Sequence, residues 1–100
     1  MAAKVTVVAR VWVKPGKEKE VLRELLHLVT ETHKEDGCLN YDLHRSHDDP
    51  ALFLFYENWT SQAHLDRHAQ SAHIRAFRAK VADLLAEPAE IKLYERLEPA

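Results

Sequence analysis

Residues 5–35 read VTVVARVWVKPGKEKEVLRELLHLVTETHKE, and the spacing of the apolar residues changes part-way along this stretch. Val5 to Val13 is rich in β-branched side chains, which predicts a strand. Lys14-Pro15-Gly16 is a turn sequence that ends this strand. From Lys17 to about Glu35 the apolar residues recur with a helical period, in a stripe formed by Val21, Leu22, Leu25, Leu28 and Val29. Gly37 stands where a left-handed helix C-cap is expected, so the stretch predicts a strand, a turn and a helix.

The next two apolar segments are short and predict a pair of strands. Leu39 to Arg45 alternates between apolar and polar residues. Ser46 to Pro50 is rich in turn-forming residues. Leu52 to Trp59, which reads LFLFYENW, combines aromatic and aliphatic side chains in the manner of a buried strand. We therefore expect a β-hairpin here.

Helical spacing returns after the hairpin. A short helix is predicted from the Thr60-Ser61 cap to about His68. Ser71 is a second cap candidate, and the apolar stripe that follows it consists of Ile74, Phe77, Val81, Leu84 and Leu85. Pro88 ends this helix, and Ile91 to Leu97 predicts a last strand. The order strand-helix-strand-strand-helix-strand predicts an α+β fold of the ferredoxin-like type, with helices on one face of a four-stranded antiparallel sheet.

The composition is that of a globular protein, with 46% hydrophobic and 30% charged residues. We expect a single domain over residues 1–100. The 16 acidic residues outnumber the 14 basic ones, so nucleic acid is not an expected partner. No apolar run approaches the roughly 20 residues of a membrane span, and the first residues lack a signal-peptide pattern, so we expect a cytoplasmic protein. Cys38 is the only cysteine, which excludes an internal disulfide.

The second face of the predicted sheet is too apolar to face water. Helices cover only one face, and a face in contact with water should be polar at every second position. Val8 and Trp12 lie opposite the predicted core face of the first strand, and the run LFLFY places large apolar groups on both faces of the third. We therefore expect the second face to pack on another sheet in a two-fold homodimer.

Three of the seven histidines fall close together in the second half of the chain. His64 and His68 are four residues apart, a spacing that puts both on one face of a helix. The zinc-hydrolase motif requires a glutamate directly after the first histidine, whereas Leu65 follows His64. We therefore predict no metal site and place His64 on a solvated helix surface. His68 and His73 lie nearer the apolar sides of their helices, where each is either a hydrogen-bonded structural histidine or a catalytic one.

Glu57 is the most informative acidic residue. On a strand its side chain shares a face with three aromatic residues, namely Phe53, Phe55 and Trp59. A carboxylate in such surroundings must be paired, have a raised pKa or lie at a wet pocket, which is the usual setting of a general base. A structural ion pair with Arg10 or Arg45 is the alternative. Trp59 is either a core residue or part of an aromatic-lined cleft for a flat phenolic or quinonoid ligand.

Several motifs resemble those of the antibiotic biosynthesis monooxygenase domain. The first is Glu57-x-Trp59-x-Ser61, followed by Leu65-x-x-His68-x-x-Ser71-x-His73 and then Phe77. The second is Glu35-Asp36-Gly37-Cys38-Leu39-x-Tyr41, which is similar to the family's segment entering the second strand. The third is Lys14-Pro15-Gly16-Lys17, which resembles its first strand-to-helix turn. The resemblance covers essentially the whole chain.

The resemblance implies a dimeric α/β barrel and, in its quinol-monooxygenase-like branch, an enzyme that uses O₂ without flavin, haem or metal. The expected reaction is the oxidation of a quinol or polycyclic phenol. His68 or His73 is then the base or the group that orients the phenolate, with Glu57 as its partner. The pocket is expected to be lined by Trp59, Tyr41, Tyr56 and Phe77.

Two other functions stay open. One is an isomerase of a small phosphorylated or hydroxyketone metabolite, which shares the acid and the base. It also needs a cationic anchor in the pocket, such as Arg10, Arg45 or Arg75. The other is a non-catalytic, dimeric module that sequesters a small aromatic molecule. A pocket that is shallow, or blocked by Trp59, favours this last function.

Overall fold

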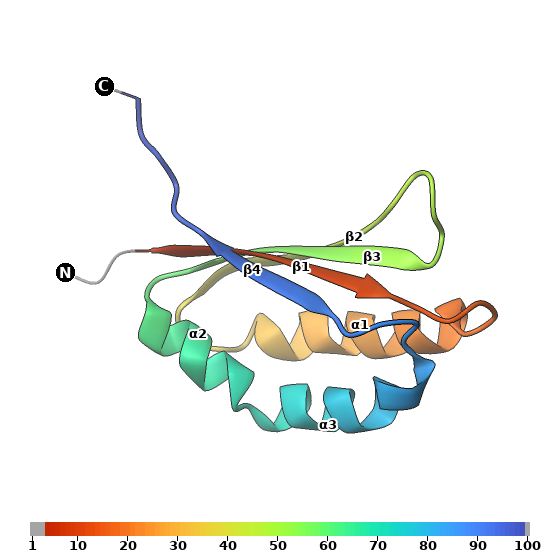
Figure 1. Ribbon diagram of the computed structural model, residues 1–100. Helices are drawn as coiled ribbons and strands as arrows, with labels where there is room; N and C mark the ends of the chain where they lie inside the picture. Colours follow the sequence, from red (N-terminus) through yellow and green to blue (C-terminus); the bar gives the residue numbers. More distant parts are fainter. Residues whose placement is uncertain (1–3, 100) are drawn as a thin grey trace.

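The computed structural model describes residues 4–99, which form one sheet covered on one face by helices (Figure 1). The elements are β1 (Val5–Trp12), α1 (Glu18–Thr32), β2 (Cys38–Arg45), β3 (Leu52–Trp59), α2 (Gln62–Ala69), α3 (Ala72–Val81), the 3₁₀ turn η1 (Ala82–Leu84) and β4 (Glu90–Tyr94). The sheet order is β2-β3-β1-β4, and all neighbouring strands are antiparallel. The predicted ferredoxin-like α+β fold is confirmed. No helix within the described residues is long and apolar enough to cross a membrane.

α1 ends at Thr32, earlier than the predicted end near Glu35. The chain then enters a loop in which the Glu35 N–H donates to the Thr32 carbonyl at 2.9 Å. The helix C-cap is His33 and not Gly37, but Gly37 has φ +84°, which glycine adopts without strain. A Cβ atom on Gly37 would overlap the His64 ring. The loop therefore packs directly against the first turn of α2.

The segment after α3 also differs from the prediction. α3 ends at Val81 and η1 follows, where a longer helix was expected. The chain turns here because it bonds to the end of β1. The Ala86 N–H donates to the Trp12 carbonyl at 2.8 Å, and the Leu84 carbonyl accepts from the Lys14 N–H at 2.9 Å. These bonds lead the chain into β4, which ends at Tyr94 and so is shorter than predicted.

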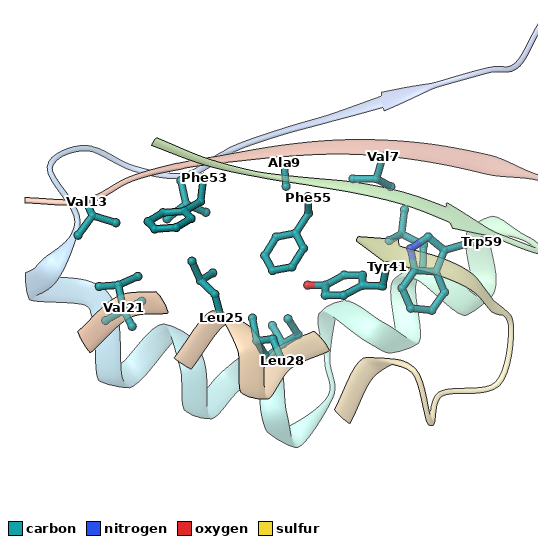
Figure 2. Close-up of a cluster of buried hydrophobic side chains, with 14 residues drawn as sticks. Val7, Ala9, Val13, Val21, Leu25, Leu28, Tyr41, Phe53, Phe55 and Trp59 are labelled. Carbon is teal, nitrogen blue, oxygen red and sulfur yellow. The ribbon is translucent and has the colours of Figure 1, made fainter. Parts of the chain in front are cut away.

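The core lies between the sheet and the helices (Figure 2). Alternate residues of β1 point into it, namely Val7, Ala9 and Val11, and so does Val13, which directly follows the strand. β3 contributes Phe53, Phe55 and Trp59, and α1 contributes Val21, Leu25 and Leu28. The register of the two central strands sets Glu57 opposite Val7. Because side chains alternate along a strand, Glu57 faces this core rather than the outer face of the sheet.

The outer face of the sheet carries many apolar side chains. Val8, Trp12, Leu52 and Leu54 are half-buried, and Tyr56 and Tyr94 are exposed. A short polar ladder crosses the same face. Thr6 Oγ1 donates to Asn58 Oδ1 at 2.6 Å, and Asn58 Nδ2 donates to Asn40 Oδ1 at 2.8 Å. The outer face is thus as apolar as its sequence indicates.

Candidate active site

A cavity of about 510 Å³ lies on the helical side of the sheet. Its walls are mainly apolar and come from β1, β4, α2 and α3, with Val7, Val11, Ile91, Leu93, Leu65 and Ile74 among them. Six side chains with polar atoms also line it, namely Tyr41, Glu57, Gln62, Asp66, His68 and Arg78. A mostly apolar cavity of this size with a few polar groups is typical of a site for one small molecule.

Glu57 is buried in the wall of this cavity, with 4% of its surface exposed. Its Oε1 accepts a hydrogen bond from Trp59 Nε1 at 3.0 Å. The proposed ion pair with Arg10 or Arg45 is wrong. Arg10 instead lies 3.7 Å from a carboxylate oxygen of Glu90, and the Arg45 guanidinium lies 5.0 Å from the centre of the Phe53 ring.

Burial raises the pKa of Glu57 to about 7. Two smaller effects oppose each other, because the hydrogen bond from Trp59 lowers this pKa and the charge of Glu35 raises it. Near neutral pH the carboxyl group therefore exists in both protonation states. A group of this kind can both accept and donate a proton.

His68 projects from α2 and borders the cavity. Its ring is buried against two aromatic rings, with centroid distances of 4.7 Å to Trp59 and 5.3 Å to Tyr41. Its Nδ1 lies 2.6 Å from Glu35 Oε2. Burial lowers the pKa of His68, although the hydrogen bond to Glu35 acts in the opposite direction. The ring is therefore a neutral imidazole that donates from Nδ1, which leaves Nε2 as the basic nitrogen.

The second histidine, His73, meets the same carboxylate oxygen. His73 Nε2 lies 2.8 Å from Glu35 Oε2, so this one oxygen accepts from both rings. The three groups come from the loop after α1, from α2 and from the first turn of α3. Their candidate ligand atoms all lie within 4.8 Å of one another, which is close enough to hold a metal ion.

Glu35 is the site residue that the sequence reasoning missed. It is separated from His68 by 33 residues and from His73 by 38, and it was expected at the end of a helix. The histidines were assigned Glu57 as a partner, but the hydrogen-bond partner of Glu57 is Trp59. The available signal was the position of Glu35 in the Glu-Asp-Gly segment that leads into β2.

Only some of the aromatic residues that were predicted to line the pocket do so in the structure. Tyr41 and Phe77 line the cavity. Tyr41 lies beside Phe55 and Trp59 at one end of the core (Figure 2), and burial raises its pKa, so its hydroxyl stays protonated. Trp59 is fully buried and, contrary to the prediction, is not among the residues that line the cavity. Tyr56 points to the opposite face of the sheet and lies outside the cavity.

His64 does not join the other two histidines. It is half-buried rather than solvated, and its Nδ1 lies 2.9 Å from Thr60 Oγ1 and 2.7 Å from Ser61 Oγ. Its ring closes the space above Gly37. His64 therefore joins the loop after α1 to the start of α2, the two segments that carry Glu35 and His68.

The chain is similar to known proteins along most of its length. The family model for antibiotic biosynthesis monooxygenase matches residues 4–80. This range includes Glu35, Glu57, His68 and His73. This chain belongs to the antibiotic biosynthesis monooxygenase family. Within this family, it is 39% identical over 101 residues to a Mycobacterium tuberculosis protein named "Putative monooxygenase Rv0793", covering all of this chain and 98% of that protein. The solved structure of Rv0793 superposes with a TM-score of 0.90 at 33% identity, covering 98% of this chain and 99% of that one.

Two further relatives differ in coverage. An uncharacterized Synechocystis protein, sll1783, is 35% identical over 91 residues, which are 91% of this chain but only 62% of that protein. An Escherichia coli protein named "Probable quinol monooxygenase YgiN" is 29% identical over 86 residues, covering 76% of this chain and 83% of its own length. The family model and the names of Rv0793 and YgiN support a monooxygenase at a general level.

Proposed function

We propose that this chain is a monooxygenase that oxidises a quinol or a polycyclic phenol with O₂ and needs no cofactor. The observation that carries the proposal is the mostly apolar cavity bordered by His68, whose Nδ1 is bound to Glu35 and whose Nε2 is the basic nitrogen. Membership of the monooxygenase family supports the reaction type. The relative YgiN, named a probable quinol monooxygenase, supports a quinol as the substrate class.

His68 acts as the general base in this mechanism. A flat phenolic substrate enters the cavity and packs against Tyr41 and Phe77, both of which line it. His68 Nε2 accepts the phenolic proton, and Glu35 stabilises the imidazolium that forms. The cavity wall shields the resulting anion from water, which raises its reactivity. Glu57 exchanges a proton with the second oxygen of the substrate.

The anion itself is the reductant of O₂. It transfers electrons to O₂ to give a peroxide on a ring carbon, and the O–O bond then breaks. One oxygen atom stays on the ring as a carbonyl and the other leaves as water, with the protons that the substrate released. For a quinol the sum is quinol plus O₂ giving a hydroxyquinone plus water, so the substrate supplies all four electrons and no external reductant is required.

Oxygen uptake tests this proposal. The purified protein is mixed with each of a panel of reduced naphthoquinones and anthrones. The rate of oxygen uptake is then compared with the spontaneous rate for the same compound. We expect a catalysed rate with at least one compound and a loss of about 10²–10⁴-fold in His68→Gln, the usual contribution of a general base. The matched control is His47→Gln, in the exposed β2–β3 turn. A wild-type rate equal to the spontaneous rate across the panel contradicts the proposal.

An isomerase is the second candidate, and one observation favours it. Arg10, Arg45 and Arg75 do not line the cavity, but Arg78 does. Among residues 4–99 its hydrogen-bond partner is the Ala69 carbonyl, which lies at a long 3.4 Å from Nη1. Arg78 is therefore available to bind a phosphate or carboxylate. Saturable binding of a phosphorylated hydroxyketone that is lost in Arg78→Gln, together with no oxygen uptake, favours this function over the oxygenase.

A binding module without catalysis is the third function to separate. The cavity is large enough for one small aromatic molecule, so the depth of the pocket does not favour this module over an enzyme. Tight binding of an oxidised naphthoquinone by a protein that turns over neither quinols nor hydroxyketones identifies the module.

We also propose that the protein works as a homodimer. The apolar outer face of the sheet supports this, since Trp12, Leu52 and Leu54 are only half-buried within one chain. Packing these side chains on a second copy removes them from water. The site described above lies on the opposite, helical face of the sheet, so the dimer leaves it accessible.

A further inference from the structure

We propose that Glu35, His68 and His73 form a binding site for one divalent transition-metal ion, with Zn²⁺ as the ion that suits them best. The three donor groups converge on a small space, because Glu35 Oε2 lies 2.6 Å from His68 Nδ1 and 2.8 Å from His73 Nε2. Two imidazoles and one carboxylate are a common ligand set for zinc, with the fourth position left open. Binding itself does not depend on the proposed oxygenase function.

The movement required is small. Zinc takes nitrogen and oxygen ligands at about 2.0–2.2 Å, so neighbouring ligand atoms of a tetrahedral site are about 3.3 Å apart. The two contacts to Glu35 must therefore open by about 0.5–0.7 Å. The two histidine nitrogens, which lie within 4.8 Å of each other, must come to the same separation of about 3.3 Å.

The three ligands are already held in place. His68 packs against the rings of Trp59 and Tyr41, and the loop that carries Glu35 is tied to the end of α1 by the bond to the Thr32 carbonyl. His73 is on the first turn of α3, behind the Ser71 cap. Preorganised ligands lower the cost of ordering the site around an ion.

An ion can also reach the site. The side chains of Glu35 and His73 are 16% and 17% exposed, while that of His68 is 7% exposed. The ion therefore enters from the side of Glu35 and His73, without unfolding of α2. Two neutral imidazoles and one carboxylate give a nitrogen-rich set, which selects zinc, nickel or copper over Mg²⁺ and Ca²⁺.

Binding has a consequence for the base. In the hydrogen-bonded state His68 carries its proton on Nδ1 and has a basic Nε2. A metal ion occupies Nδ1, so the neutral ring must carry its proton on Nε2 instead. Nε2 then no longer accepts a proton from a substrate. This inhibitory effect rests on the proposed function, whereas the binding does not.

Calorimetry tests the site directly. The protein is stripped with a chelator, dialysed, and titrated with Zn²⁺ in the presence of excess Mg²⁺. We expect saturable binding of one ion per chain and a rise in the unfolding temperature. His73→Gln and Glu35→Gln are each expected to weaken binding at least tenfold, the lower end of what loss of a ligand-shell group costs. His47→Gln, which removes an exposed histidine, is expected to match the wild type.

Adventitious binding to surface histidines is the result that overturns the proposal. It is recognised by wild-type, His73→Gln and Glu35→Gln titrations that coincide. Co²⁺ provides a second readout that needs no variant, because tetrahedral coordination gives intense visible absorption bands. Absence of these bands in the wild type also overturns the proposal.

Oxygen uptake with and without Zn²⁺ separates this inference from the proposed function. If Zn²⁺ binds to Glu35, His68 and His73 but the zinc-free protein oxidises no substrate, the metal site stands and the oxygenase proposal fails. If oxygen uptake occurs but Zn²⁺ neither binds nor inhibits, the metal site fails and the oxygenase stands. If Zn²⁺ binds to these three residues and oxygen uptake continues unchanged, the inhibition inferred from the His68 tautomer is wrong.

Discussion

At the scale of single residues, Glu57 couples stability to pH. Its pKa is about 7 in the folded protein, against 4.5 for an ordinary glutamate. Between pH 4.5 and about pH 7 the folded state therefore still holds a proton that the unfolded state has lost. The stability from this proton is fully present below pH 4.5 and is lost as the pH rises through 7. Between pH 5 and pH 8 the loss amounts to about 2.5 kcal/mol.

Glu57→Gln isolates this effect, because glutamine does not titrate and its carbonyl still accepts from Trp59 Nε1. We expect the wild type to lose about 2.5 kcal/mol more unfolding free energy than Glu57→Gln between pH 5 and pH 8. Urea unfolding of both proteins at the two pH values measures the difference. Parallel pH profiles for the two proteins contradict the raised pKa.

Glu35 is a positioning residue in the proposed mechanism, since it acts on the substrate through His68. Glu35→Gln is expected to lower kcat by up to about 10⁴-fold with little change in KM, in line with the loss of a carboxylate that orients a catalytic histidine. Imidazole ¹⁵N chemical shifts provide a readout of the tautomer itself. We expect the Nδ1–H form of His68 in the wild type and a mixture in Glu35→Gln, and unchanged shifts contradict this role.

The residues of the site were predictable from the sequence to different degrees. Glu57 was placed correctly because alternation along β3 fixes its face. The same alternation places its neighbour Tyr56 on the other face, so Tyr56 was not a consistent choice for the pocket. Glu35 could not be predicted as a site residue. Its contacts to His68 and His73 span more than thirty residues and depend on the conformation of the loop after α1.

At the scale of elements, the loop between α1 and β2 depends on Gly37. Gly37 and Gly16 both have positive φ, of 84° and 88°. The room for a side chain differs between them. A Cβ atom on Gly37 would overlap the His64 ring, whereas one on Gly16 would meet nothing within 4 Å. Gly16→Ala is thus a matched control that contains the backbone cost alone.

We expect Gly16→Ala to cost about 1 kcal/mol of unfolding free energy, from backbone strain. Gly37→Ala is expected to cost about 1–3 kcal/mol more, from overpacking against His64. Part of this extra cost should be recovered in the double variant Gly37→Ala/His64→Ala. Chemical denaturation of the four proteins measures these differences. Equal losses in the two glycine variants contradict the packing of this loop on α2.

The order and type of the elements were predictable because each has a clear apolar period and a turn signal before it. The boundaries that differed were set by contacts between distant segments. α3 gives way to η1 where the chain bonds to the end of β1, and α1 stops at Thr32 where the loop with Glu35 turns toward α2. Local spacing does not contain such contacts.

At the scale of the whole molecule, the two faces of the sheet have different roles in our proposals. The helical face holds the cavity, and the outer face is proposed to pack on a second copy. Leu54 lies opposite Arg10 near the middle of the outer face, and a charge there should prevent that packing. Leu26 on α1 is 51% exposed and offers a matched control away from the sheet.

We expect light scattering to give the wild type twice the mass of the 11.6 kDa chain. Leu54→Glu is expected to give the mass of a single chain, and Leu26→Glu the mass of the wild type. A monomeric wild type at micromolar concentration contradicts the dimer. A dimeric Leu54→Glu protein places the interface elsewhere.

The fate of labelled oxygen tests directly whether the cavity beside His68 is an oxygenase centre. A reduced naphthoquinone is incubated with ¹⁸O₂ and either the wild type, His68→Gln or no protein, and the product is analysed by mass spectrometry. We expect one ¹⁸O atom in the hydroxyquinone formed by the wild type, at a rate that His68→Gln reduces to near the spontaneous level. Label incorporation that is equal in the three reactions contradicts the assignment of this site as an oxygenase centre.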